Sequence, residues 1–196
     1  MDKTKTTIGL LDLHIAPITA EPAGALPTYG AAKSLGHAVR AALTVNTANT
    51  PIYGDDALQV TLDEFISGAL EVQTLMDDLE IRQILFGGTY SAQDGLTQST
   101  EDTGTPVAVF GIRKLLKKDK SIIYRAEVFF RCEANKTSSG WDADTKSQST
   151  QNKNATTNFD ISPASSGAWN WEQDYETAAA ALAGIKTKLG LTNTGP

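Results

Sequence analysis

Short runs of alternating apolar and polar residues, separated by clusters of Gly, Pro, Asn, Asp and Ser, recur along most of the 196 residues. Such a period of two is typical of a half-buried β-strand, whose successive side chains point to opposite faces of a sheet. The clearest run is residues 122–133, and the chain is therefore predicted to fold mainly as β-sheet. One face of this run is expected to carry Ala126, Val128, Phe130 and Cys132, and the other Arg125, Glu127, Arg131 and Glu133.

The same pattern, bounded by turn residues, predicts a series of further strands. Pro17 is expected to end the first of them, and Gly68 is expected to separate two consecutive ones. Near the C-terminus, Trp169 and Trp171 have the spacing of two that a strand gives. The predicted strands are residues 8–18, 38–46, 58–65, 69–73, 106–113, 159–161 and 168–175.

Two segments, residues 76–86 and 177–189, change to the helical spacing of apolar residues. Glycines follow both, at Gly87 and Gly190, and glycine readily adopts the left-handed conformation that ends a helix. A short flanking helix and a C-terminal helix are therefore predicted. In the first segment Met76, Leu79 and Gln83 fall at helical spacing, and Ile81, Ile84 and Leu85 widen the apolar stripe; the second stripe is Leu182, Ile185 and Leu189.

Polar segments rich in turn-forming residues join these elements, and none has the composition of an interdomain linker. Residues 90–105 are predicted to be a loop and residues 115–121 a lysine-rich turn. Residues 19–30 and 135–158 are long and poor in apolar groups, which is typical of extended arms. Residues 1–196 are thus predicted to form a single domain with polar arms near 19–30 and 135–158.

The charge of the chain limits its partners. The net charge is −6, whereas a protein that holds DNA by its phosphates needs a basic face. The local lysine cluster at residues 114–120 is interrupted by Asp119 and is interpreted as a solvated hairpin turn. No apolar run approaches the roughly 20 residues that span a bilayer. The polar N-terminus is not followed by the apolar region of a secretory signal, so cytosolic synthesis without a membrane partner is expected.

Residues that could carry chemistry do not converge on one motif. His14 and His37 lack a neighbouring nucleophile or carboxylate in a known catalytic context. Cys132 lies on the apolar face of its predicted strand, where burial raises a thiol pKa and makes the thiol inert. The doublet Asp55 and Asp56 lacks the further oxygen ligands that a calcium site needs, so a turn is favoured over a metal site. We assign no catalytic, cofactor-binding or metal residues and do not expect an enzyme.

Motifs in a fixed order run through residues 8–161. Together they resemble the major tail protein, or tail tube, family of long-tailed phages and prophages of Gram-positive bacteria, although no single motif is specific. The family-motif turn corresponds to Tyr53, Gly54, Asp55 and Asp56, with Gly54 where Ala is more usual. The stretches that carry the resemblance are IGLLDLHIA (8–16), PTYG (27–30), IYGDD (52–56), GALEV (68–72), LFGG (85–88), TPVAVFG (105–111) and YRAEVFF (124–130).

The resemblance implies a β-sandwich or half-barrel of the tail-tube type, mainly β with α, carrying a flanking short helix and a C-terminal helix. It implies a structural virion protein that forms hexameric rings, stacked into a tube through which DNA passes without specific binding. The implied partners are further copies of the chain and other tail proteins, namely the tape measure, tail terminator and distal tail proteins. The implied location is the virion tail, after synthesis in the bacterial host cytoplasm, and no cofactor is implied.

An acidic bore would repel DNA phosphates and let the genome slide. The polar faces of residues 58–65 and 122–133 are candidates for lining it, and Asp63, Glu127 and Glu133 are the candidate lumen-facing acids. Two alternatives remain open. The first is a surface carbohydrate-binding β-sandwich, with Trp141, Trp169 and Trp171 as its sugar platform. The second is another ring-forming protein, such as a tail terminator or a type VI secretion tube-like protein.

Overall fold

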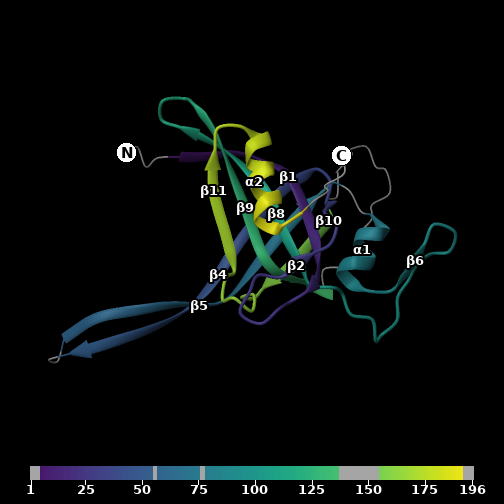
Figure 1. Ribbon diagram of the computed structural model, residues 1–196, viewed down its shortest axis with the longest axis horizontal. Helices are drawn as coiled ribbons and strands as arrows, with labels where there is room; N and C mark the ends of the chain where they lie inside the picture. Colours follow the sequence, from purple (N-terminus) through teal and green to yellow (C-terminus); the bar gives the residue numbers. More distant parts are fainter. Residues whose placement is uncertain (1–4, 55–56, 76–77, 137–154, 192–196) are drawn as a thin grey trace, which may run out of the picture.

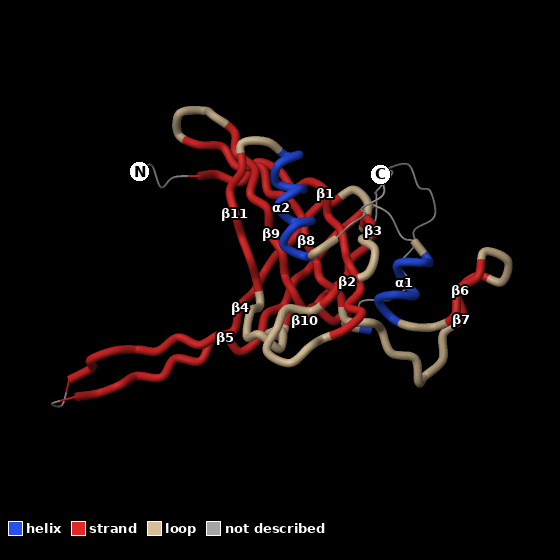
Figure 2. The backbone as a smooth tube through the Cα atoms, viewed as in Figure 1, coloured by secondary structure: helices blue, strands red, loops and turns tan. Residues whose placement is uncertain are grey.

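The fold is mainly β with two helices in the described residues, as the alternation predicts (Figures 1 and 2). The computed structural model describes residues 5–54, 57–75, 78–136 and 155–191. The strands are β1 (Lys5–Ala20), β2 (Thr28–Tyr29), β3 (Lys33–Ser34), β4 (Ala38–Gly54), β5 (Ala57–Thr74), β6 (Thr89–Ser91), β7 (Gly95–Thr97), β8 (Val107–Lys117), β9 (Ile122–Ala134), β10 (Ala155–Ile161) and β11 (Asn170–Tyr175). The helices are α1 (Leu79–Phe86) and α2 (Ala178–Leu189).

Nine of these strands form one sheet in the order β2-β1-β8-β9-β10-β5-β4, with β11 paired to β9 and β3 paired to β1. The pairings between these strands are antiparallel. The sheet curls so that β4 at its end lies against β1, without pairing with it in the part of the chain that is described (Figure 1). The curl gives the sheet an inner face, enclosed by β10, β5 and β4, and an outer face covered by α2.

The central strands β8 and β9 bury side chains on both of these faces. In β8, Val107 and Val109 point inward, while Ala108, Phe110 and Ile112 point toward α2. Two-sided burial requires a nearly continuous apolar run instead of an alternating one, which the sequence VAVFGI supplies. The core therefore consists of two clusters separated by the thickness of one sheet.

A β-bulge in β9 changes which side chains share a face of the sheet, so the predicted faces of this strand are partly wrong. Val109 pairs with Phe129, but Val107 pairs with Cys132, so β9 contains an extra residue between these pairs. Phe130 consequently packs under α2, whereas Cys132 packs inside the curl. The prediction that Cys132 shares a face with Phe130 is wrong, because alternation does not reveal the point at which a strand gains a residue.

Gly68 does not break the chain as predicted, since the two strands expected at 58–65 and 69–73 are one continuous strand, β5. Gly68 pairs with Val45 on one side and Ile161 on the other. A Cβ at this position would lie 3.4 Å from the Ile161 side chain and 3.3 Å from the Thr44 carbonyl oxygen. The glycine therefore permits a close approach between strands.

Beyond Gly68 the β4–β5 hairpin leaves the curled body and projects from it (Figures 1 and 2). We call the projecting residues 47–66 the arm. Its two strands pair from Thr47 with Phe65 as far as Gly54 with Ala57. An irregular register at its base leaves Ile66 outside the pairing and 57% exposed. This register shift accompanies the departure of the hairpin from the body, as bulges commonly bend strands.

Both helices end at the predicted glycines. In α1 the Asp78 side chain caps the N-terminus by accepting from Glu80 N, and Gly87 follows the last residue with φ 81°. The predicted start of this helix at residues 76 and 77 lies outside the described residues. Leu79 is 43% exposed, so the predicted stripe is wrong there; Ile81, Ile84, Leu85 and Phe86 make the packing face.

Helix α2 is capped by Thr177, whose side chain accepts from Ala180 N, and ends at Gly190 in the left-handed conformation. Its buried residues Ala181, Ile185 and Leu189 fall on one side and cover the outer face of β8 and β9. Lys188 places its ammonium 5.9 Å from the ring centres of both Phe130 and Trp171. The C-terminal helix thus closes the second core cluster.

Two predicted loops contain more structure than expected. Residues 90–105 contain most of the β6–β7 hairpin. The segment ends against α1, where Thr105 N donates a hydrogen bond to the Ile84 carbonyl. Residues 19–30 begin within β1, which continues past Pro17, and end in β2. Tyr29 ties this segment to the chain's own body, since its hydroxyl donates to the Phe130 carbonyl at 2.9 Å. Of the predicted arm at 135–158, residues 137–154 lie outside the described residues.

Replacing Phe159 with Ala is expected to lower the free energy of unfolding by about 3–5 kcal/mol, because this fully buried ring lies in the inner cluster. Urea denaturation followed by circular dichroism measures the change. The matched control is Ile122→Ala, at a side chain that is 40% exposed, where a loss below about 1 kcal/mol is expected. Equal losses in the two variants would contradict the assignment of Phe159 to the core.

Candidate functional site

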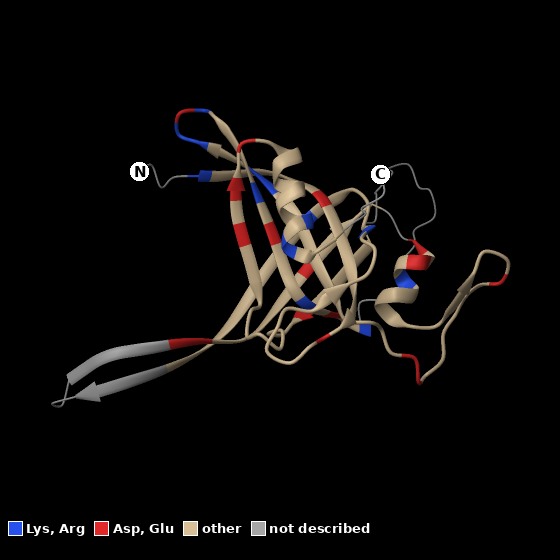
Figure 3. Cartoon of the chain, in the orientation of Figure 1, with Lys and Arg blue, Asp and Glu red and all other residues tan. Residues whose placement is uncertain are grey.

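Oppositely charged side chains alternate on neighbouring strands at the open end of the inner face (Figure 3). The pairing of β8, β9 and β11 places Arg113 opposite Arg125, Asp174 opposite Arg125, and Glu172 opposite Glu127. Like charges directly opposite each other are unfavourable, so Arg113 reaches diagonally to Glu127, whereas Arg125 pairs with Asp174 directly across the strands. We call Lys5, Arg113, Arg125, Glu127, Glu172 and Asp174 the ion-pair network.

The network is held by short contacts. Arg113 Nη2 donates to Glu127 Oε1 at 2.8 Å, and Arg113 Nε lies 2.7 Å from Glu127 Oε2 without the alignment of a hydrogen bond. Arg125 donates two hydrogen bonds to Asp174, from Nε to Oδ1 at 2.7 Å and from Nη2 to Oδ2 at 3.2 Å. Glu172 lies between the two arginines, 3.2 Å from Arg125 and 3.5 Å from Arg113. Lys5 pairs with Asp174 from β1.

The pKa values of two carboxylates in the network are shifted in opposite directions. Burial raises the pKa of Glu127, whose side chain is only 15% exposed, and the neighbouring Arg113 offsets part of that rise. The hydrogen bond from Arg125 lowers the pKa of Asp174 to about 2, and Lys5 contributes to the same shift. Both carboxylates therefore have cationic partners, so this face presents balanced charge.

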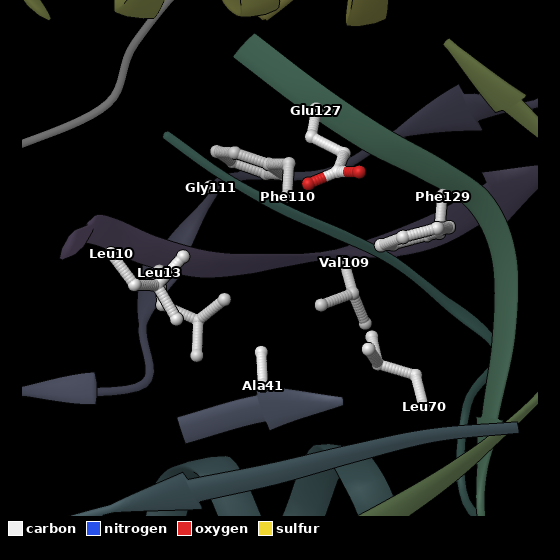
Figure 4. A pocket seen from close by; sticks show the side chains of 9 residues that line it. All are labelled: Leu10, Leu13, Ala41, Leu70, Val109, Phe110, Gly111, Glu127 and Phe129. Atoms are coloured by element: carbon white, nitrogen blue, oxygen red, sulfur yellow. The ribbon is translucent and has the colours of Figure 1, made fainter. Parts of the chain in front are cut away.

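A cavity of about 30 Å³ lies beside Glu127, at the seam where β4 meets β1 (Figure 4). Glu127 is the one ionisable group among its described lining residues, which are otherwise apolar or glycine. A volume of this size accommodates about one water molecule and no organic substrate. The lining residues are Leu10, Leu13, Ala41, Leu70, Val109, Phe110, Gly111, Glu127 and Phe129.

The structure separates the three candidate lumen-facing acids. Asp63 is exposed on β5 within the arm. Glu127 lies on the inner face in the ion-pair network, while Glu133 lies on the outer face and pairs with Arg131 at 2.8 Å. The β9 bulge reverses the faces between Glu127 and Glu133, so the prediction that they share one polar face is wrong.

The family-motif turn lies at the far end of the arm. Tyr53 pairs with Leu58 and Gly54 with Ala57, which places the end of β4 and the start of β5 side by side. Asp55 and Asp56 fall outside the described residues.

The cysteine and histidine side chains that could have carried chemistry pack against other residues instead. Cys132 is fully buried, and burial raises the pKa of its thiol, as predicted. The His14 ring stacks on Phe110 with centroids 5.5 Å apart. Among the described residues, no three His, Cys, Asp or Glu side chains are grouped to hold a metal ion. Neither described helix combines the length and apolar character needed to cross a bilayer.

The two described tryptophans of the proposed sugar platform do not lie together. Trp169 stacks on Phe65 in a parallel arrangement, with ring centres 4.3 Å apart, and packs against the inner cluster. Trp171 packs against the outer cluster beneath Lys188. The spacing of two predicted a shared strand, but β11 begins at Asn170, after Trp169. Trp141 falls outside the described residues.

Two projections carry exposed charges: the base of the arm and the lysine turn, which we define as residues 114–120 (Figure 3). Asp63 and Glu64 are exposed on the arm, and Lys118 and Lys120 on the turn. Asp119 is held within the turn, because its Oδ1 accepts from Ser121 N at 2.9 Å and from Ser121 Oγ at 2.6 Å. Within the described residues, none of Asp63, Glu64, Lys118 and Lys120 forms an ion pair.

Sequence reasoning did not identify Arg113, Glu172 or Asp174 as members of a network. The available signal was alternating charge in consecutive strands, Arg125 and Glu127 in one and Glu172 and Asp174 in another. A scan of the chain against protein-family models finds no match, and neither does a search of the curated proteins.

Replacing Arg125 with Gln is expected to raise the pKa of Asp174 from about 2 toward 3.8, because the hydrogen bond from Arg125 is the largest cause of the shift. A folded pKa below the unfolded value means that this carboxylate stabilises the fold above pH 3.8. That contribution disappears as the pH falls to about 2. Carboxyl-carbon NMR titration measures the pKa.

The expected loss of stability at pH 7 is small, about 0.5–1 kcal/mol, because the pair is partly exposed. This difference between wild type and variant should shrink on acidification through the same window. The control variant Arg40→Gln removes an ion pair with Glu71 elsewhere on the sheet and should leave Asp174 unchanged. An unshifted Asp174 in Arg125→Gln would show that Arg125 does not set its pKa.

Proposed function

We propose that this chain is a structural subunit that polymerises with copies of itself into stacked rings, forming the tube of a phage tail and the conduit for its DNA. The observation that carries the proposal is the arm, a two-stranded hairpin that extends beyond the curled body. An isolated two-stranded hairpin is marginally stable in water and gains stability by packing on another surface. Among the described strands, the strands of the arm pair only with each other, and Phe65 at the base stacks on Trp169 of the body.

Free strand edges support the same proposal. Strand β4 lies at the end of the sheet order, and β11 pairs only with β9 among the described strands. Unpaired backbone N–H and C=O groups along an edge can pair with a strand of another copy. A closed ring of such subunits removes the edges that would otherwise remain open.

The sequence motifs between residues 8 and 161 are the reason for proposing a phage tail tube in place of another assembly. They resemble the tail tube family in order, and the mainly β fold with a flanking helix and a C-terminal helix is consistent with a member of it. The tail-tube form of sandwich or half-barrel belongs to this proposal, as do hexameric rings. In the proposed virion, the tube contacts the tape measure, tail terminator and distal tail proteins.

The charge of the subunit suits a conduit. A net charge of −6 gives no general attraction for phosphate, so DNA can pass without being held. Glu127 and Glu133 have cationic partners in Arg113 and Arg131, so Asp63 is the one candidate acid without an ion pair among the described residues. The proposed role is structural and requires no catalytic group.

Negative-stain electron microscopy of the purified chain at high concentration tests the proposal, and uniform hollow tubes or rings are expected. A shortened-arm variant, with residues 50–62 replaced by Asn-Gly, joins the paired residues Asn49 and Asp63 through a two-residue turn. This variant should remain folded by circular dichroism and form no tubes, because it lacks most of the arm.

The matched control shortens the other hairpin by replacing residues 92–94 with Asn-Gly between the paired Ser91 and Gly95. This control is expected to assemble as wild type does. A wild-type chain that remains monomeric at every concentration would contradict the proposed function. Tubes formed equally by the shortened-arm variant would show that assembly does not depend on the arm.

A further inference from the structure

The charges of the chain are unevenly distributed between two projections. Residues 41–81 contain no Lys or Arg, and Asp63 and Glu64 are exposed on the arm within that stretch. The lysine turn contains four lysines, of which Lys118 and Lys120 are exposed. Figure 3 shows the turn and the base of the arm well separated, so the two cannot meet within one chain.

Within the described part of the chain, the exposed charges of the arm and of the turn are not paired with opposite charges from other elements. Asp119 is the one acid within the turn, and its hydrogen bonds to Ser121 direct it to the turn's own backbone and side chain. The four exposed residues Asp63, Glu64, Lys118 and Lys120 form no ion pair within the described residues. Elsewhere the chain pairs its charges closely, as in the ion-pair network and between Arg131 and Glu21.

We propose that the acidic arm of one copy docks on the lysine turn of a second copy of this chain. This inference rests on the proposed function and deepens it by naming the two surfaces of a contact between subunits. The contact is heterologous, because two different patches meet, and such contacts repeat from copy to copy into rings or open polymers. The occupant of the lysine turn is thus a protein surface instead of nucleic acid.

Apolar side chains near the arm complement the charges. Val45 and Ile66, at the base of the arm, are 39% and 57% exposed. Phe65 anchors the same base to the body through its stack on Trp169, which fixes the direction of the arm before contact. Opposite charges then steer the approach and select the register, while the apolar groups contribute buried area.

A charge-exchange experiment tests the contact. Variant A carries Asp63→Lys and Glu64→Lys, so the base of its arm and its turn are both basic; variant B carries Lys118→Glu and Lys120→Glu, so its turn becomes acidic like the base of its arm. Each variant alone is expected to raise the critical concentration for assembly at least tenfold. An equimolar mixture should recover assembly, because every arm then finds a turn of opposite sign in the other variant. Sedimentation and negative-stain microscopy measure these outcomes.

A control variant with Glu101→Lys and Asp160→Lys makes the same change in net charge as variant A, at exposed positions outside the arm and the turn. It is expected to assemble as wild type does, and circular dichroism verifies the fold of all variants. Salt provides a second measurement. At 1 M ionic strength the screening length falls to about 3 Å, so wild-type assembly should weaken and the mixture of A and B should lose its recovery.

The outcomes separate the two proposals. Variants A and B that each assemble like wild type would overturn the arm-to-turn contact and leave the tube intact as a proposal. Loss of assembly in both variants without recovery in the mixture would show that the two surfaces have other partners. Binding of DNA to the lysine turn of wild type that is lost in variant B would assign that surface to nucleic acid and also overturn the inference. Failure of wild type itself to assemble would overturn both proposals.

Discussion

Two-sided burial of the β8–β9 pair is the constraint on which the rest of the fold depends. A strand pair that is apolar on both faces must be covered on both, and the chain provides one cover for each. The curl of β10, β5 and β4 encloses Val109, Phe129 and Cys132, while α2 covers Phe110 and Phe130. On the inner face at one end of the pair, ion pairs between β8, β9 and β11 take the place of apolar packing. The same requirement thus positions the curl, the C-terminal helix and the ion-pair network.

Local patterns were sufficient to predict many elements but not their arrangement. Alternation located β8 and β9, and the glycines at 87 and 190 located the helix ends, because each signal depends on a few adjacent residues. The β9 bulge was not predictable, since its extra residue is defined by the register with β8. Gly68 was misread for a similar reason. A glycine that breaks a strand and one that admits a close neighbour look alike until Ile161 is brought beside it.

For the charged residues too, exposure was predictable from the local sequence, whereas the ion pairs between distant strands were not. Exposure of the lysine turn and of Asp63 followed from their polar surroundings in the sequence, and the structure places both on projections. The pairing of Glu127 with Arg113 and of Arg125 with Asp174 depends on three strands distant in sequence and could not be read from any one of them. Alternation alone grouped Glu127 and Glu133 on one face. The β-bulge between them places Glu127 on the inner face of the sheet and Glu133 on the outer face.

This separation of charges has a consequence for how the proposed assembly would hold together. Exposed ion pairs contribute only about 0–1 kcal/mol each, so a single arm-to-turn contact built on Asp63, Glu64 and two lysines would be weak. A weak contact still gives a firm assembly when it repeats, because each copy in a ring is held by several neighbours at once. Weakness also permits correction, since a subunit that docks in the wrong register can leave before the next one arrives. The balanced ion-pair network and the unbalanced arm therefore suit different roles: the first stabilises the fold of one subunit, and in the proposed assembly the second would select the neighbouring subunit.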